Sequence, residues 1–361
     1  MTHLPRRSLL AAGGTAVATV AAPLVAGAAE TRRTWRMITS WPRDLPGPGV
    51  NARRLAERIT AMSGGRLSVQ LFAAGELVPG LQVFDAVNAG VAEMGHTASI
   101  YWTGKTRAAA YFTTVPWGLT PLEHIAWIEH GGGQALWDEL YAPFNLKPLM
   151  AGSSGMQMGG WFRREIGALA DLRGLKIRAV GLSADIFQKL GAIGVVLPAG
   201  EIFPALQNGT VDGVEFLGPN SDRAQGFYQV APYYYWPTFT KPNGTAECII
   251  RLDAWEKLEP DLKAIVAEAA RAENQVTLAE SEWRAAEALA DLTDNRKVQL
   301  RAWPEDVLRA AHVAGEEILA EVEREGEVEA KVARAYRDAL ARLRRWSAVS
   351  AQAYLGARAL G

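Results

Sequence analysis

The sequence has little of several features that mark common classes of protein. Its 361 residues include one cysteine, Cys248, which excludes an internal disulfide framework and a cysteine-cluster metal site. The 38 basic and 39 acidic residues leave a net charge of −1, so the chain carries no electrostatic footprint for nucleic acid. With 49% apolar and 21% charged residues, the composition is that of an ordinary globular protein. Intrinsic disorder and a fold with several membrane spans are therefore excluded.

The motifs that would support an enzyme are also missing. Gly104-Lys105-Thr106 resembles the end of a phosphate-binding loop, but the first glycine of that loop would fall at Ser99. Residues 152–155 resemble a nucleophile elbow, whose closing glycine is replaced by Met156. The five histidines form no metal-binding or acid–base pattern. We therefore expect a protein that is not an enzyme and has no organic cofactor.

Residues 1–28 predict an export signal. Arg6-Arg7 precede a weakly apolar run, and Ala26-Gly27-Ala28 offers a small-residue cleavage pattern. The run is too short and too rich in glycine and threonine to anchor in a membrane, which takes about 20 strongly apolar residues. The paired arginines favour the twin-arginine route, although a general secretory signal would also contain them. The mature chain is expected to begin near Ala29 and to work in the periplasm.

A strand–helix–strand rhythm runs through the first two thirds of the mature chain. Residues 35–39 and 67–71 have strand patterns, and residues 50–62 between them carry apolar side chains at helical spacing. The rhythm returns over residues 175–197, where two strand patterns flank a helix at 185–190. Such alternation indicates a parallel sheet covered by helices. Because the chain is about twice the usual domain size, the sequence predicts an α/β fold with two doubly wound lobes.

The last hundred residues are predicted to be mainly helical. Asp253 and Glu256 form a capping-box pattern, Pro260 fits a first helical turn, and a helical run continues to about Leu292. This run is unusually long for one globular helix, so it is expected to span both lobes. Residues 304–355 form further helices whose apolar positions face one way. Those positions are Val307, Ala311, Ala314, Ile318, Val322, Val332, Tyr336, Ala339, Leu343 and Trp346. Such a face docks either on its own chain or on a partner subunit.

Three glycine-punctuated stretches are candidate binding segments, and they centre on Gln157, Arg178 and Glu215. An arginine at the exit of a sheet strand suits a carboxylate, because its planar fork pairs both oxygens. An amide oxygen and a carboxylate together suit a hard cation. Each residue also has a simpler interpretation. Gln157 could bond the backbone of a turn, Arg178 could cap a solvated strand, and Glu215 could be a salt-bridge partner.

The same stretches carry a resemblance to a known family. With "LRGLKIR" ending at Arg178 and "ALQNGTVDGVE" ending at Glu215, the mature chain resembles the periplasmic solute-binding subunit of a tripartite ATP-independent periplasmic (TRAP) transporter. "GMQMGGWF" at 155–162 and "ASIYWTGK" at 98–105 resemble the branch that binds 2-oxo and 2-hydroxy monocarboxylates such as pyruvate and lactate. The resemblance implies a periplasmic-binding-protein-like fold that captures a small organic acid for membrane subunits. It also implies a homodimer that exchanges a C-terminal helix.

The resemblance assigns roles to individual residues. Arg178 matches the arginine that pairs with the ligand carboxylate, and Tyr101 and Trp102 match aromatic side chains of the pocket. Gln157 and Glu215 match ligands of a metal ion that lies between the carboxylate and the protein. Oxygen ligands alone do not choose among sodium, calcium and magnesium, and the resemblance favours sodium or calcium over magnesium.

Three further residues take their roles from the same resemblance. Phe216 would contribute its backbone carbonyl to the metal, and its side chain stands where the branch commonly has tryptophan. The pocket wall thereby loses an indole N–H and some bulk, so a longer or more branched acid becomes plausible. Asn220 is expected at the ligand, and Glu247 is expected as a further metal ligand.

The expected domain organisation follows the two lobes. Residues 32–153 and 244–283 would form the first lobe, and residues 154–243 and 284–300 the second. Residues 301–361 would form the C-terminal helices that a dimer could exchange. The cargo stays open, because a dicarboxylate, a sugar acid or an aromatic acid would suit the same frame. A sensor that presents its ligand to a receptor is a further alternative to transport.

Overall fold

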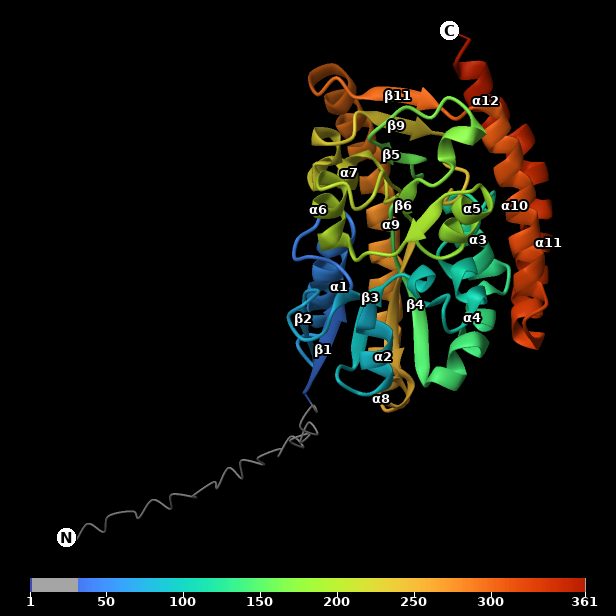
Figure 1. Ribbon diagram of the computed structural model, residues 1–361. Coiled ribbons are helices and arrows are strands. Elements are labelled where there is room, and N and C mark those ends of the chain that lie inside the picture. The colour runs from blue at the N-terminus through green and yellow to red at the C-terminus, as the bar shows by residue number, and fades with distance from the viewer. Residues whose placement is uncertain (2–31, 361) are drawn as a thin grey trace. The chain divides into compact units, whose positions relative to one another are not determined.

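Two β-sheets, each covered by helices, organise the chain (Figure 1). The computed structural model describes Met1 and residues 32–360, so the predicted export signal lies outside the described residues apart from Met1. The first sheet has the strand order β2-β1-β3-β10-β4, and the second has the order β11-β9-β5-β8-β6-β7. The first contains β1 (Arg33–Thr39), β2 (Leu67–Phe72), β3 (Met94–Thr97), β4 (Leu146–Ser153) and β10 (Thr245–Arg251). The second contains β5 (Gly160–Phe162), β6 (Lys176–Arg178), β7 (Ile193–Val195), β8 (Gly213–Val214), β9 (Tyr233–Trp236) and β11 (Gln299–Ala302).

Helices connect and cover these strands. The α-helices are α1 (Pro48–Met62), α2 (Val83–Asn88), α3 (Pro121–His130), α4 (Gly133–Tyr141), α5 (Leu182–Lys189), α6 (Ile202–Gln207), α7 (Pro219–Gln225), α8 (Leu252–Glu256), α9 (Pro260–Ala290), α10 (Glu305–Glu323), α11 (Glu327–Val349) and α12 (Ala351–Arg358). Short 3-10 helices are η1 (Gly80–Gln82), η2 (Ser99–Trp102), η3 (Arg107–Phe112), η4 (Ala142–Phe144), η5 (Leu169–Leu172), η6 (Ala199–Glu201) and η7 (Phe227–Gln229). One turn of π-helix, η8 (Asp291–Asn295), extends α9. The mixed α/β fold with two sheets agrees with the prediction.

The predicted strand–helix–strand units form parallel pairs. In the first sheet β1 is parallel to β2, with Trp35 opposite Val69, and to β3, with Met37 opposite Met94. Between β1 and β2, helix α1 ends at Met62 before two glycines, which have φ angles of 61° and 80°. Glycine adopts this left-handed region without steric cost, so the pair stops the helix where the sequence predicts.

Both sheets also contain antiparallel strands, which mark the places where the chain passes from one sheet to the other. The chain leaves β4 and enters the second sheet at β5, which is antiparallel to β8 and β9. It returns from β9 through residues 237–244 to β10, which is antiparallel to β3 and β4. The two crossing segments touch, since Ser154 N donates to Gly244 O at 2.9 Å. This junction lies at the binding pocket described below.

The long helix α9 runs beside both sheets (Figure 1). It packs on α1 and β4 of the first sheet and on α7 of the second. The predicted place of Pro260 in a first helical turn is confirmed, since α9 begins at Pro260, whereas Asp253 and Glu256 lie in a separate short helix, α8. Proline cannot continue a preceding helix, and Glu259 before it has the extended ψ of 149°. No side chain caps α8 at its N-terminus, so the predicted capping box does not form.

The C-terminal helices α10 and α11 pack within the chain. Helix α10 lies on α5, and α11 lies on α3, α4 and η3. Ile318, Val322 and Tyr336, three of the residues for which a partner subunit was considered, are buried against the same chain. Trp346 is 67% exposed. Among the described residues no helix is both long and apolar enough to span a membrane.

Candidate functional site

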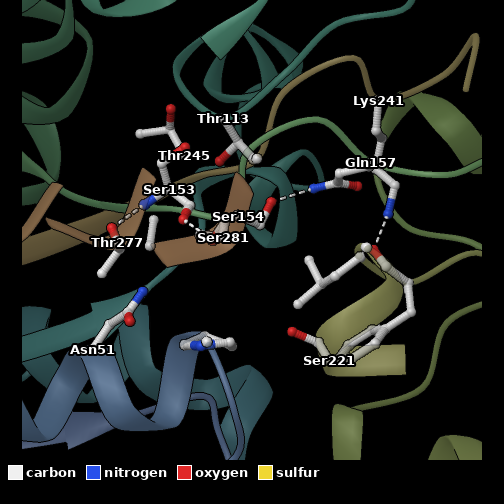
Figure 2. Close-up of a pocket in the computed structure, with 18 of the residues that line it drawn as sticks. Asn51, Thr113, Ser153, Ser154, Gln157, Ser221, Lys241, Thr245, Thr277 and Ser281 are labelled. Carbon is white, nitrogen blue, oxygen red and sulfur yellow. Dashed lines mark hydrogen bonds between the residues drawn. The ribbon is translucent and has the colours of Figure 1, made fainter. Parts of the chain in front are cut away.

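A pocket lies where the two sheets, the crossing segments and α9 meet (Figure 2). The first sheet and its helices contribute Trp41, Pro48, Asn51, Ala98, Ile100, Tyr101 and Thr113. The second sheet contributes Arg178, Val180, Phe216, Leu217, Gly218, Asn220 and Ser221. The ends of β4 and β10 contribute Ser153, Thr245 and Ala246, and the crossing segments next to them contribute Ser154, Gln157, Lys241 and Gly244. Helix α9 contributes Thr277, Glu280, Ser281 and Ala285. Of the predicted site residues, the pocket brings together Tyr101, Gln157, Arg178, Phe216 and Asn220.

Arg178 is a buried cationic residue at the end of an interior strand of the second sheet. It ends β6 and its residue is only 1% exposed. Its Nε and Nη2 donate to Leu197 O at 3.2 and 3.0 Å, and its Nη1 donates to Glu215 O at 2.8 Å. A guanidinium has five N–H groups, so two are left for other acceptors. Arg178 is therefore held rigidly, and it can still pair with an anion in the pocket.

Aromatic side chains stand on either side of this guanidinium. Its central carbon lies 5.6 Å from the centroid of the Phe216 ring. Burial raises the pKa of the nearby Tyr101 phenol, and the positive charge of Arg178 opposes this rise. Tyr101 therefore stays protonated at neutral pH. The planes and donors around Arg178 suit a small planar anion.

A second cation, the Lys241 ammonium, lies in the same pocket. No motif or spacing in the sequence marks Lys241 as a binding residue. Its Nζ donates to Phe216 O at 2.6 Å and lies 3.7 Å from Glu215 Oε2. The other carboxylate oxygen, Glu215 Oε1, accepts from the Thr240 hydroxyl. Lys241 sits in the crossing segment between β9 and β10, flanked by prolines, where no periodicity predicts which way a side chain points.

Burial and charge act in opposite directions on this ion pair. Burial lowers the pKa of Lys241, whereas the neighbouring Glu215 raises it and the nearby Arg178 lowers it further. Burial raises the pKa of Glu215, and Lys241 and Arg178 oppose that rise. An anionic ligand in the pocket would favour the charged form of Lys241.

Gln157 occupies the junction of the two crossing segments. Its Nε2 donates to Ser154 Oγ at 2.8 Å, whereas its Oε1 has no hydrogen-bond partner (Figure 2). The two side chains pass directly over Gly244, where a Cβ would lie 2.1 Å from both Gln157 Nε2 and Ser154 Oγ. Glycine is therefore required at position 244 so that the Gln157 and Ser154 side chains can lie against the backbone there. An unusual backbone angle is not the reason. The arrangement presents a free amide oxygen to the pocket.

Helix α9 supplies a polar edge to the pocket. Thr277 Oγ1 accepts from Ser153 N at 2.8 Å, and Ser281 Oγ donates to Ser153 O at 3.0 Å (Figure 2). Ser153 is the last residue of β4, where the chain leaves the first sheet. The helix thus holds the start of a crossing segment through both of that residue's backbone groups.

Three predicted site residues, Trp102, Glu215 and Glu247, are not among the residues that line this pocket, although Glu215 contacts the lining residue Lys241. The carboxylate of Glu247, in β10, accepts from Ser99 Oγ and Trp102 Nε1 of η2, each at 2.7 Å. Burial raises the pKa of Glu247 to about 7. Trp102 and Glu247 are held in a closed hydrogen-bond group, which explains why neither faces the ligand site.

The oxygens that the resemblance assigns to a metal ion are present, but they do not fit one as arranged. Gln157 Oε1 and Glu215 Oε2 lack hydrogen-bond partners, which would suit a cation. However, Phe216 O is already bonded by Lys241 Nζ, and the same ammonium faces Glu215. A metal ion on these oxygens would lie beside that charge, and two unit charges 4 Å apart repel by about 4 kcal/mol at a protein-like dielectric constant. Among residues 32–360 no three His, Cys, Asp or Glu side chains form a metal-binding group.

Comparison with known proteins gives consistent matches. The family described as bacterial extracellular solute-binding protein, family 7 (DctP), matches residues 48–325. A protein from a Nostoc species, named a monocarboxylate 2-oxoacid-binding periplasmic protein, is 42% identical over 277 residues, which are 77% of this chain and 76% of that protein.

Solved structures agree with this match. A TRAP periplasmic solute-binding protein from Pseudoalteromonas atlantica, with bound sodium and pyruvate, has a TM-score of 0.87 at 33% identity and covers 90% of this chain and 99% of its own. A TRAP solute-binding protein from Bordetella bronchiseptica has a TM-score of 0.88 at 32% identity and covers 91% of this chain and 97% of its own. The latter is described as a mixed-occupancy dimer with calcium and picolinate in one site. The prediction that such relatives hold sodium or calcium is confirmed by these structures.

Proposed function

Because the chain belongs to bacterial extracellular solute-binding protein family 7, the DctP family of TRAP transporter solute-binding proteins, we propose that it captures a 2-oxo or 2-hydroxy monocarboxylate in the pocket between its sheets. The observation that carries this proposal is the buried Arg178, whose guanidinium is fixed by two backbone carbonyls and retains two N–H groups. The 42% identity to a 2-oxoacid-binding relative supports the ligand class.

The proposed role is capture and delivery, and no covalent bond is made or broken. The pocket has a cationic end at Arg178 and Lys241 and a hydroxyl-rich edge at Ser153, Thr277 and Ser281. The cationic end suits the carboxylate, and the hydroxyl groups suit a ligand oxygen at C2 or ordered water. The bound acid would then be passed to the membrane subunits of the transporter.

The family works in the periplasm, and its relatives are named periplasmic proteins, so the predicted location is confirmed. Export of this chain by the twin-arginine route is part of the proposal and rests on Arg6-Arg7. Replacing Arg6-Arg7 by lysines in an export reporter tests it, since the twin-arginine route would stop.

Ligand capture is proposed to close two lobes around the pocket. The lobes would be residues 32–153 with 244–283 and residues 154–243 with 284–300, as the sequence predicts. Two observations support this division. The first pair of ranges contains every strand of the first sheet, and the second pair contains β5 to β9 and the start of β11. The chain crosses between the sheets in only a few segments. Such a joint permits hinge motion about the crossing segments.

We also propose a homodimer formed through the end of α11 and α12. The apolar side chains Trp346, Val349, Tyr354 and Leu355 are 67%, 73%, 65% and 49% exposed in the described residues. A run of exposed apolar side chains at a terminal helix is typical of an interface. The Bordetella bronchiseptica relative is described as a dimer, which supports this assignment.

A thermal-shift screen of small carboxylates tests the proposed function. The panel should include pyruvate, lactate, longer and branched 2-oxo acids, picolinate, a dicarboxylate and a sugar acid, each with and without chelator. We expect the largest stabilisation from a 2-oxo or 2-hydroxy monocarboxylate, since a bound ligand raises the free energy of unfolding by mass action. Stabilisation by the dicarboxylate or sugar acid alone would contradict the assigned ligand class.

A further inference from the structure

The position of the Lys241 ammonium bears on how the pocket holds an anion. Lys241 is only 4% exposed, and its residue lies in the segment that crosses from β9 to β10. Figure 2 shows its side chain reaching into the pocket, with the bond from Nζ to the Phe216 carbonyl as a dashed line. A buried lysine normally needs a carboxylate partner, and Glu215 supplies one.

The ammonium contacts the oxygens that a metal ion would use. The 2.6 Å bond from Lys241 Nζ to Phe216 O occupies the backbone oxygen, and Glu215 Oε2 lies 3.7 Å away. The third such oxygen, Gln157 Oε1, lines the same pocket without a hydrogen-bond partner. An ammonium has three N–H groups in a compact head, so it can serve several oxygens from one position as a small cation does.

The pocket already presents two cationic side chains to an anion. Of its charged lining residues, Arg178 and Lys241 are positive, and Glu280 pairs with Arg54 at 2.8 Å. Behind the lining, Glu215 pairs with Lys241, and Asp222 accepts from Trp161 and Tyr234. Sodium or calcium would add one or two further positive charges beside these two cations.

We propose that the Lys241 ammonium takes the place of the metal ion, so that this chain binds its monocarboxylate without sodium or calcium. The inference rests on the proposed function and separates this chain from the relatives whose structures contain sodium or calcium. The ligand would be held between two fixed cationic side chains, Arg178 and Lys241.

Calorimetry under strict control of cations tests the inference. The mature protein is unfolded, dialysed free of ligand, refolded in a chelator-treated buffer with a large organic cation, and titrated with pyruvate. The same titration is repeated with sodium chloride and with calcium chloride. We expect equal affinity in all three buffers, and bound-metal analysis should find no stoichiometric sodium or calcium. Binding that appears only after sodium or calcium is added would overturn the inference and leave the proposed function standing. If pyruvate and the other acids of the screen failed to bind in every buffer, the proposed function would fall and the inference with it.

Variants at Lys241 make the test independent of trace metal. Lys241→Met removes the charge and should weaken pyruvate binding more than about tenfold in the metal-free buffer, as loss of a charge-assisted hydrogen bond does. Lys241→Glu adds an oxygen ligand in its place, so calcium should restore binding to this variant and leave the wild type unchanged. Lys257→Gln, at an exposed lysine of α8's end, is the matched control. Wild-type affinity of a folded Lys241→Met variant in the metal-free buffer would contradict the inference, and a thermal melt confirms folding.

Discussion

At the scale of single residues, Arg178 is both a ligand group and a structural one. Its three bonds to Leu197 O and Glu215 O join the segments that follow β7 and β8, so removing it takes the Arg178 donors away from both carbonyls. This dual role could not be predicted from the sequence, which placed Arg178 only at a strand exit.

Arg178→Ala is expected to weaken carboxylate binding by about a hundredfold to ten-thousandfold, because two charge-assisted hydrogen bonds contribute about 1.5–3 kcal/mol each. Arg178→Lys should recover little, since lysine lacks the planar fork. Calorimetry measures the affinity, and the exposed Arg173→Ala is the control. Wild-type affinity in either Arg178 variant would show that the carboxylate is bound elsewhere.

Glu247 predicts a pH dependence of stability. Its pKa is raised from 4.5 to about 7 in the folded chain, so the folded state binds the extra proton more tightly than the unfolded state. The resulting stabilisation is present below about pH 4.5 and is lost as the pH rises through 7, and it amounts to about 3 kcal/mol.

Glu247→Gln should abolish this contribution, so that the variant gains stability relative to wild type between pH 5 and pH 8. Denaturant unfolding at the two pH values measures it, with the exposed Glu57→Gln as the control. An unchanged stability difference between variant and wild type across this range would contradict the assignment.

The candidate site was only partly predictable at this scale. Gln157, Arg178 and Phe216 lie in glycine-rich motifs whose pattern marks them, and the structure places all three in the pocket. Trp102 and Glu247 came from the resemblance alone, and their side chains bond each other instead. Lys241 was missed, because its segment has neither strand nor helix periodicity and its direction is set by the meeting of two crossing segments.

At the scale of elements, α9 fixes the place where the chain leaves the first sheet. Thr277 bonds Ser153 N, and both residues are buried. Thr277→Val should leave that amide without a partner and lower the free energy of unfolding by about 1–3 kcal/mol. Denaturant unfolding measures the loss, and Thr293→Val in the half-buried π-helical turn after α9 is the control. Equal loss in both variants would argue against a specific role for the Ser153 bond.

The end of the chain carries the prediction on assembly. Since α10 and α11 are already packed on the same chain, the exposed apolar residues that remain lie from Trp346 onward. Deleting residues 351–361 should therefore convert a homodimer into a folded monomer. Light scattering gives the mass of both proteins. A full-length mature protein that is strictly monomeric at micromolar concentration would contradict the dimer.

Element types were predicted better than element ends. The strands at 35–39 and 67–71 appear as β1 and β2, since their alternation faces one buried side. The capping-box pattern at Asp253 and Glu256 does not begin the long helix, because both residues lie in α8 and α9 begins at Pro260. The antiparallel strands β5 and β10 were not predicted, because their direction depends on which sheet the chain comes from.

At the scale of the whole molecule, the pocket for an anion lies between two sheets that are joined by crossing segments. The buried cations Arg178 and Lys241 come from different elements, β6 and the segment before β10, so the fold assembles the site from distant parts of the sequence. This is also why composition alone, with a net charge of −1, gives no indication of a cationic pocket.

A crystal structure of the mature protein grown with pyruvate tests the central claim most directly. We expect one pyruvate per chain in the pocket at the junction of the sheets, with its carboxylate paired to the Arg178 guanidinium. Pyruvate bound away from Arg178, or with its carboxylate turned from that guanidinium, would contradict the account.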